Sequence, residues 1–292
     1  MKYHTRIDLH MHTTVSDGTD TPEEILVRVR EAGIGLFSVT DHDAVKAGRI
    51  IPPLLTEEDP AFLTGAEFSC RDEEGKYHIL GYGYDPDAAP IRELVESGHR
   101  LRIGKVNARL DFLRREFGFS FPQKELDALF ALDNPGKPHI ANMMVRHGYA
   151  RSKEQAIKEF INRIHFRNEY IRPEEAIRAI LGGGGIPVLA HPSYGDGDQL
   201  ILGEEMDARL RHLMDFGLQG VEAFYSGFTP RLRGEILSFA ERCGLYVTAG
   251  SDYHGMNKMV QLGDTGLGEP DEWPDGLRRF LRDVRKQGRY EI

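Results

Sequence analysis

Short runs of hydrophobic residues alternate along the chain with segments in which apolar positions recur every three or four residues. The runs have the length and flanking turns of buried strands, and they lie at Arg6–Leu9, Leu36–Thr40, Ala61–Phe68, Ile79–Tyr84, Ile186–Ala190, Gly220–Phe224 and Tyr246–Ala249. Strands that alternate with helices are typical of βα units. The pattern therefore predicts an α/β fold with a mostly parallel sheet.

Boundary signals support the predicted helices between these strands. Thr21 precedes Pro22 and two glutamates, an order that favours a helix N-terminus, and Gly33 follows the apolar stretch as a stop signal. Thr229–Arg242 and Pro274–Gln287 show the same kind of pattern. Each is predicted to be a helix that follows a strand.

Residues 90–180 interrupt the alternation, because helical patterns follow one another there without a strand between them. Loops are predicted where proline and glycine gather, as in Asn134-Pro135-Gly136-Lys137-Pro138. We therefore expect a body formed by residues 1–89 and 181–292, with a helical insertion or cap domain at 90–180. The four glycines at 182–185 precede a strand and lack the Lys-Ser/Thr of a P-loop, so we predict a turn there.

The composition is that of an ordinary globular chain. Of 292 residues, 40% are hydrophobic and 28% charged. No apolar run approaches the ~20 residues of a membrane-spanning helix, and the N-terminus has no apolar signal core, so a cytoplasmic protein is expected. Cys70 and Cys243 lie far apart in sequence, which makes a disulfide framework or a thiolate zinc site improbable.

The net charge of −9 is unevenly distributed. Residues 100–178 hold 16 Lys and Arg against 10 Asp and Glu, a net +6, and the remainder carries −15. This pattern disfavours a duplex DNA binder, which needs a broad basic face. It fits a small or single-stranded anionic ligand held between an acidic site and a basic cap, although solvated helix faces would show the same composition.

Metal-ligand residue types recur where predicted strands end. Side chains two apart on a strand point the same way, so the histidines of Asp8-Leu9-His10-Met11-His12 can reach one cation. Four further strands end close to such residues: His42, Glu67, His191, Asp252 and His254. Because the carboxyl ends of strands meet on one face of a barrel-type α/β fold, these side chains are expected to converge.

Asp17, in the loop after the first strand, and His78, before the strand Ile79–Tyr84, complete a set of nine candidate ligands. A set without thiolate suits Mn²⁺, Fe²⁺ or Zn²⁺. Several carboxylates in one pocket would repel one another unless cations neutralised them. The sequence therefore predicts a metal centre.

The order of these motifs along the chain resembles that of a known protein family. The segments DLHMHT, SDG, TDHD, GAE, HILG, AHP and GSDYH match, in order and spacing, the motifs of the PHP (polymerase and histidinol phosphatase) metal-dependent phosphoesterases. The resemblance covers residues ~6–85 and ~183–260. It implies a distorted (β/α)₇ TIM-like barrel with a helical insertion and a centre of two or three divalent cations.

Carried over by position, the resemblance implies three ligand sets: His10, His12, Glu67 and Asp252 for one cation, Asp17, His42 and His254 for a second, and Glu67, His78 and His191 for a third. A hydroxide held through Asp17, Glu67 and Asp252 would attack phosphorus in line. Several family members have a histidine where this chain has Asp17, and the aspartate is similar to the branch that acts on nucleotides. Glu222 ends a strand and is either a residue that orients a ligand histidine or a structural carboxylate.

Lys137 and His139 are the expected phosphate-binding residues. Nucleotide-acting relatives have a similar segment, usually with arginine where Lys137 stands, and lysine keeps the charge without the bidentate fork. Relatives also often have Gly-Arg after the His-Pro, where this chain has Ser193-Tyr194.

The expected function is hydrolysis of a small phosphorylated substrate, a nucleotide such as a 3′,5′-bisphosphonucleotide or the 5′ end of a short single-stranded RNA, with no membrane partner. Three alternatives remain: a histidinol-phosphate phosphatase, a C–N hydrolase on a similar metal barrel, and a non-catalytic metal-binding PHP module. The TDHD and GSDYH segments favour phosphoester chemistry over C–N hydrolysis. A degenerate module is disfavoured because all nine ligand positions are filled.

Overall fold

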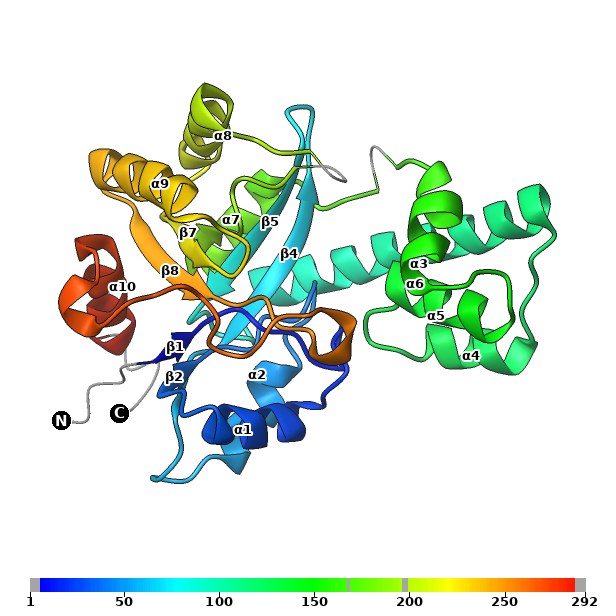
Figure 1. Ribbon diagram of the computed structural model, residues 1–292, viewed down its shortest axis with the longest axis horizontal. Coiled ribbons are helices and arrows are strands. Elements are labelled where there is room, and N and C mark those ends of the chain that lie inside the picture. Colours follow the sequence, from blue (N-terminus) through cyan, green and yellow to red (C-terminus); the bar gives the residue numbers. More distant parts are fainter. Residues whose placement is uncertain (1–5, 167–168, 196–198, 287–292) are drawn as a thin grey trace.

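The computed structural model describes residues 6–166, 169–195 and 199–286 and contains two β-sheets (Figure 1). Strands β1 (Ile7–Asp8), β2 (Leu36–Phe37) and β3 (Ala61–Phe62) form a parallel sheet. The second sheet holds, in order, β4 (Gly65–Arg71), β5 (Lys76–Tyr82), β6 (Ile186–Leu189), β7 (Gly220–Tyr225) and β8 (Tyr246–Gly250). β5 runs antiparallel to both neighbours, and the other pairs after it are parallel. The predicted α/β class is confirmed.

Backbone hydrogen bonds link the two sheets. The N–H of Leu9, just after β1, donates to the carbonyl of Ala249 on β8 at 2.9 Å. On the other side, the N–H of Glu67 on β4 donates to the carbonyl of Asp41 at 3.2 Å, beyond the end of β2. These bonds bring together the carboxyl ends of β1, β2 and β8 and the Glu67 segment of β4.

The single predicted strand Ala61–Phe68 is wrong, because the structure divides it into β3 and β4. β3 pairs with β2, whereas β4 pairs with β5. The hydrophobic run continues through the bend because Leu63 is itself fully buried, so the pattern shows no break. A change of pairing partner between β3 and β4 does not alter the pattern of hydrophobic residues.

Helices surround the sheets: α1 (Pro22–Glu31), α2 (Ala47–Ile50), α7 (Pro173–Gly182), α8 (Gly203–Asp215), α9 (Pro230–Cys243) and α10 (Asp275–Lys286) (Figure 1). The predicted start of α1 is confirmed. The Thr21 hydroxyl accepts from the N–H of Glu24, and the Glu24 carboxylate accepts from the N–H of Thr21, which forms a capping box. The predicted helices Thr229–Arg242 and Pro274–Gln287 correspond to α9 and α10, except that Gln287 lies outside the described residues.

Helices α4 (Gln123–Phe130), α5 (Lys137–Arg146) and α6 (Lys153–Gln155), with two further helical turns at Ala156–Phe160 and Ile161–Arg163, lie to one side of the sheets, and the long helix α3 (Ala89–Phe117) extends to them from behind β4 (Figure 1). We call residues 106–163 the insert and the rest of the described chain the body. The insert has its own hydrophobic core, which includes Val106, Leu113 and Met144. α7 packs instead on the main core through Ile177 and Ile180. Division into separate domains at 90–180 stays a prediction.

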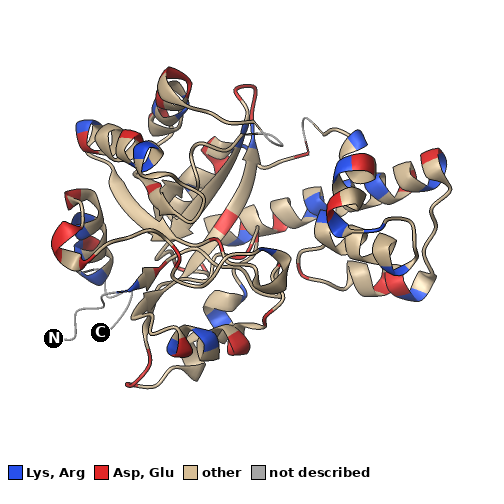
Figure 2. Cartoon of the chain, in the orientation of Figure 1, with Lys and Arg blue, Asp and Glu red and all other residues tan. Residues whose placement is uncertain are grey.

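Charged residues lie mainly on helices and in loops, and the strands carry few of them (Figure 2). Several basic residues of the insert are exposed and ion-paired within it, as Arg114, Arg146 and Lys158 show. Solvated helix faces therefore account for part of its basic excess. No helix in the described ranges is both long and apolar enough to span a membrane.

Candidate metal centre

Glu67 lies at the centre of the candidate ligands. It is 1% exposed, and its Oε2 lies 3.0 Å from His42 Nδ1, 3.2 Å from His12 Nε2 and 3.4 Å from His10 Nε2. Its Oε1 accepts hydrogen bonds from two further rings, at 2.8 Å from His78 Nδ1 and 3.1 Å from His191 Nε2. One carboxylate thus contacts five histidines.

His10 and His12 follow β1 and are completely buried. As expected for residues two apart in an extended segment, both approach the same carboxylates: their Nε2 atoms lie 3.4 and 3.3 Å from Asp252 Oδ1. Asp252 follows β8, and its N–H donates to the His10 carbonyl. The two strand ends therefore meet as the pattern predicted.

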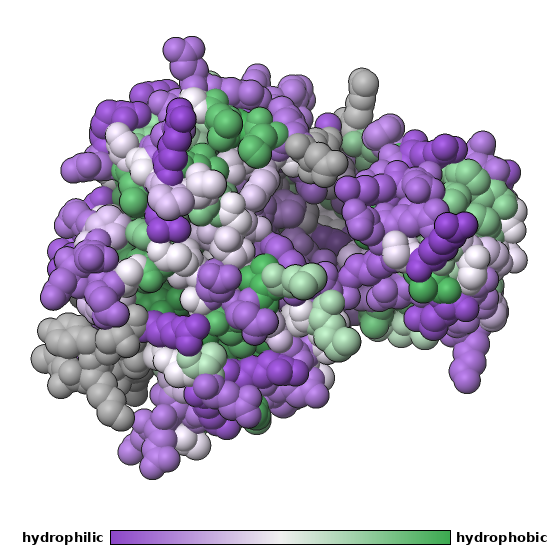
Figure 3. Space-filling view, in the orientation of Figure 1, coloured by the Kyte–Doolittle hydropathy of each residue, from purple (hydrophilic) through white to green (hydrophobic). Residues whose placement is uncertain are grey.

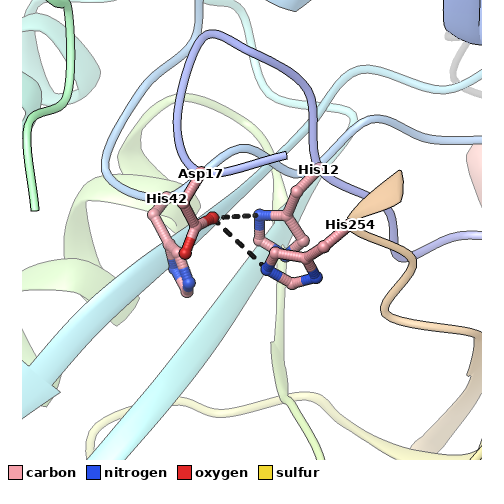
Figure 4. A group of neighbouring side chains, drawn as sticks. All are labelled: His12, Asp17, His42 and His254. Atoms are coloured by element: carbon pink, nitrogen blue, oxygen red, sulfur yellow. Dashed lines mark ion pairs between the residues drawn. The ribbon is translucent and has the colours of Figure 1, made fainter. Parts of the chain in front are cut away.

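Asp17 reaches the same cluster from the loop after β1. Its Oδ1 lies 3.3 Å from His254 Nε2 and 3.8 Å from His12 Nδ1, and His42 lies beside it (Figure 4). The structure thus brings together all nine residues that the sequence singled out. His78 was misplaced, however: it lies within β5 and pairs with Ser69 of β4, rather than before the strand.

Three groups of ligand atoms lie close enough to hold a cation, with the atoms of each group within 4.8 Å of one another. The groups are His10, His12, Glu67 and Asp252; His12, Asp17, His42 and His254; and His42, Glu67 and His78. The first is the set implied by the resemblance. The second group contains His12 in addition to the three residues implied by the resemblance. The third group contains His42 where the resemblance implied His191, and His191 contacts Glu67 directly.

The residues fit a metal centre because several buried polar atoms face one another without a hydrogen-bond partner among the described residues. These are Nε2 of His10, Nε2 of His12, Nδ1 of His42 and Oε2 of Glu67. Buried polar atoms are almost always paired, so such a cluster needs an explanation. Imidazole nitrogens and carboxylate oxygens are the ligands that first-row divalent cations bind.

The electrostatics of the cluster point the same way. Burial by itself raises the pKa of a carboxyl, but the surrounding histidine rings outweigh it and hold the pKa values of Glu67, Asp17 and Asp252 well below the usual range. Burial lowers the pKa of His42 to about 3. At His12 burial is overcome by the nearby carboxylates of Asp252 and Glu67, which raise the pKa to about 10. Three anionic carboxylates thus share one buried site with a proton that a cation can displace.

Glu222 on β7 positions two of the histidines. It is fully buried, and its Oε1 lies 2.9 Å from Nδ1 of His10 while its Oε2 accepts from the backbone N–H of His191 at 2.9 Å. The contact with His10 leaves Nε2 of that ring to face Glu67 and Asp252. Of the two roles left open for Glu222, the geometry supports that of a residue orienting a ligand histidine.

The buried carboxylate of Asp41 fixes the loop that carries the ligand Asp17. Asp41 accepts from the N–H and hydroxyl of Thr13 and from the hydroxyl of Ser16, each at 2.7 Å, which holds the loop leading to Asp17.

Gly250, at the end of β8, allows a close approach of two strand ends: a Cβ there would lie 2.1 Å from the Cβ of His10. A glycine is therefore required at this position.

Within residues 6–166, 169–195 and 199–286, three non-glycine residues have a left-handed backbone, and all three are in the cluster or next to it. They are Asp43 (φ 50°), His191 (φ 26°) and Asp252 (φ 58°). Such conformations cost an L-residue energy and concentrate at functional sites. His191 and Asp252 each lie two residues beyond a strand, β6 and β8, and their side chains reach the cluster. Asp43 lies in the segment after β2, and its carboxylate pairs with Arg102.

A pocket of about 300 Å³ opens at the cluster. Besides ligand residues it is lined by Pro138, Lys153, Asn257 and Lys258. The first two belong to the insert and the last two to the loop after β8, and the space-filling view shows a hydrophilic hollow between body and insert (Figure 3). Sequence patterns missed the two lysines and the asparagine, because isolated residues of these types are common on any surface.

Lys137 and His139 lie on the first turn of α5 beside Pro138. Lys137 Nζ donates to Oδ1 of Asn162 at 2.7 Å. Burial lowers the pKa of His139, and the negative charge of Asp17 acts against this shift. The pocket lining includes neither residue, and their role in binding phosphate stays a prediction.

Comparison with characterised proteins gives relatives along most of the chain. The chain is 30% identical over 259 residues to phosphoribosyl 1,2-cyclic phosphate 1,2-diphosphodiesterase of Eggerthella lenta, covering 85% of this chain and 94% of that protein. It is 26% identical to 3′,5′-nucleoside bisphosphate phosphatase of Chromobacterium violaceum, over 95% and 96% of the two chains. The 5′-3′ exoribonuclease Rnm of Salmonella typhimurium is 27% identical, over 88% and 87%. No protein-family model matches the chain.

Solved structures agree with the sequence relatives. A protein of Bifidobacterium adolescentis assigned as a metal-dependent phosphoesterase superposes with a TM-score of 0.78 at 28% identity, over 94% of this chain and 95% of that one. An amidohydrolase structure from Chromobacterium violaceum gives a TM-score of 0.81 at 23% identity, over 98% and 97%, and shows the shared fold. The motifs, the cluster and these relatives agree. The chain belongs to the PHP family of metal-dependent phosphoesterases and is a hydrolase that uses divalent metal ions.

Proposed function

We propose that this protein hydrolyses phosphomonoesters of nucleotides, such as 3′,5′-bisphosphonucleotides, or of RNA 5′ ends, with two or three cations of Mn²⁺, Fe²⁺ or Zn²⁺. The names of the bisphosphate phosphatase and the exoribonuclease support this substrate class. Asp17, in place of the early histidine of other family branches, supports it as well. A histidinol-phosphate substrate has no such support.

The observation that carries the proposal is the position of Glu67. Its two oxygens contact five histidine rings, and any two of the three candidate cation groups have one residue in common, which is Glu67, His12 or His42. Because a carboxylate has two oxygens, Glu67 can bind two neighbouring cations, and pairs of cations ~3.5–4 Å apart are typical of phosphatases and nucleases. The shared ligands therefore support a multinuclear site rather than separate single ions.

When bound, the cations would supply Lewis acidity and lower the pKa of water, so that a nucleophile exists at neutral pH. The chain provides the charges that hold them: Asp17, Glu67 and Asp252 are anionic at neutral pH because their pKa values are lowered. The first turn of α5, with Lys137 and His139, would face the substrate phosphate. A helix N-terminus favours an anion, and Pro138 of the same turn already lines the pocket.

The proposal includes the architecture of the site. The bonds from Leu9 to β8 and from Glu67 to the segment after β2 support the expected distorted (β/α)₇ TIM-like barrel formed by both sheets, with β3 and β4 together in the place of one predicted strand. Residues 90–180 would act as a cap over its mouth. In support, the insert contributes Pro138 and Lys153 to a pocket otherwise lined by the body.

The test has two parts. Purified protein is first analysed for Mn, Fe and Zn, and a non-catalytic module would show bound metal without turnover. A substrate panel then includes a nucleoside 3′,5′-bisphosphate, a 5′-phosphorylated RNA, a cyclic phosphodiester and histidinol phosphate. We expect the highest kcat/KM for the bisphosphate or the RNA, and a preference for histidinol phosphate would overturn the proposal. A preference for the cyclic diester would indicate the activity named for the Eggerthella lenta relative.

A further inference from the structure

Two lysines line the pocket beside the metal ligands, and they approach it from different parts of the molecule. Lys258 lies in the loop after β8, four residues beyond His254. Lys153 begins α6 of the insert. Lysines facing a cluster of carboxylates from two sides suggest a site for an anionic ligand between them.

Lys258 is attached to the cluster itself. Its ammonium group forms an ion pair with Oδ2 of Asp252 and donates to the Tyr225 hydroxyl at 2.9 Å. Asp252 uses its other oxygen, Oδ1, towards His10 and His12. An ammonium has three N–H donors, and these two acceptors are its hydrogen-bond partners among the described residues, so one donor is available. The side chain is also one-third exposed, towards the pocket.

Lys153 spans the gap between insert and body. Its Nζ donates to Oδ1 of Asn257 at 2.6 Å, and Nδ2 of Asn257 donates to the carbonyl of Asp17 at 2.7 Å. Asn257 and Lys258 are consecutive, so one short loop accepts the hydrogen bond from Lys153 and also carries Lys258. Burial lowers the pKa of Lys153, and the negative charge of Asp17 acts against this shift.

Charge explains why such lysines matter here. Asp17, Glu67 and Asp252 line the pocket as anions, and cations bound among them would offset their charge. The ammonium groups of Lys153 and Lys258 add positive charge beside these cations, and charges attract more strongly near a protein surface than in bulk water, so they favour an anionic ligand. Lysine is a common phosphate ligand and acts as a point charge.

We propose that Lys258 and Lys153 form a two-lysine clamp for the substrate. Lys258, bound to a ligand carboxylate, contacts the phosphoryl group that reacts, and Lys153 contacts a second anionic group of the same molecule on the insert side. The clamp rests on the proposed function and refines it, because it selects substrates with two phosphates, or with a phosphodiester next to the reacting phosphate, over those with one.

The first experiment measures inorganic phosphate binding to the metal-loaded protein by calorimetry, together with metal content. Lys258→Met should weaken phosphate binding at least tenfold with metal content unchanged, and Lys258→Arg should restore most of it. Lys158→Met is the matched control, since Lys158 is an exposed insert lysine paired with Glu154. Metal loss in Lys258→Met would show that Lys258 only positions Asp252, and unchanged phosphate binding would show that it does not contact phosphate. Either result overturns the clamp.

The second experiment compares a nucleoside 3′,5′-bisphosphate with the matching 5′-monophosphate, as kcat/KM or, without turnover, as binding. Lys153→Met should reduce the preference for the bisphosphate at least fivefold, and Lys158→Met should leave it unchanged. Equal losses on both substrates would mean that Lys153 only tethers the insert to Asn257, which refutes its part. If wild-type protein hydrolyses no phosphomonoester but the binding differences appear, the proposed function fails and the clamp stands.

Discussion

Replacing Glu222 by glutamine tests whether the cluster depends on its supporting carboxylate. The substitution keeps the volume of a fully buried side chain but removes one acceptor. Glu222 makes two contacts, to Nδ1 of His10 and to the N–H of His191, each at 2.9 Å. An amide offers one oxygen and one NH₂ group, so it cannot accept both hydrogen bonds.

Each orientation of the new amide has a distinct cost. With the oxygen towards His10, the NH₂ group faces the N–H of His191, and a buried donor left unpaired costs about 1–3 kcal/mol of stability. With the NH₂ group towards His10, that ring must accept at Nδ1 and carry its proton on Nε2, the nitrogen that faces Glu67 and Asp252. A protonated Nε2 cannot bind a cation, and loss of such supporting contacts typically weakens metal affinity 10–100-fold, about 1.4–2.7 kcal/mol.

We therefore expect Glu222→Gln to lower metal affinity by about tenfold or more, measured by competition with a chelating dye, or to lower the stability of the metal-free protein in thermal unfolding. Glu235→Gln is the control, because Glu235 is an exposed partner of Arg231 on α9. Wild-type metal affinity together with wild-type melting temperature in Glu222→Gln would refute the reasoning.

Three further predictions concern charge at the site. Asp252→Asn should lower kcat/KM by ~10²-fold or more while the circular dichroism spectrum stays unchanged, because it removes an anionic ligand but keeps volume; wild-type turnover would mean the site is misassigned. Lys137→Ala should lower kcat/KM about tenfold, about 1.4 kcal/mol, and Lys137→Arg should retain activity, with equal values for all three proteins counting against a role in binding. Without metal, His12 has a pKa raised from 6.5 to about 10, so protonation stabilises the metal-free fold fully below pH 6.5 and the effect is lost as pH rises through about 10. A cation must displace this proton, so metal affinity should rise with pH over that window, and calorimetry in two buffers of different ionisation enthalpy should report proton release at pH 7.5.

The sequence allowed the cluster to be predicted because its members obey a local rule. His10 and His12 are two apart after a strand, and Glu67, His191 and Asp252 lie at or beyond strands whose ends converge. Such convergence follows from topology, and topology follows from the alternation of strands and helices. No knowledge of side-chain packing was needed.

The missed features depend on packing between distant segments. Lys153 meets Asn257, which is 104 positions away, and neither belongs to a pattern. The start of β5 was also missed, because Lys76 and His78 are polar residues in a strand. Tyr77 between them is 2% exposed and lies under the guanidinium of Arg209 from α8, a contact that hydropathy cannot reveal.

The left-handed backbone at Asp43, His191 and Asp252 has a consequence for how related chains diverge. Each such residue costs of order 1–3 kcal/mol, so it is retained only while its side chain is needed. In a descendant that has lost catalysis, glycine at these positions would relieve the strain and spread by drift and selection for stability. Substitution by glycine at His191 and Asp252, the two of these residues that belong to the cluster, would then distinguish lineages that have abandoned the chemistry from those that keep it, before any enzyme is assayed.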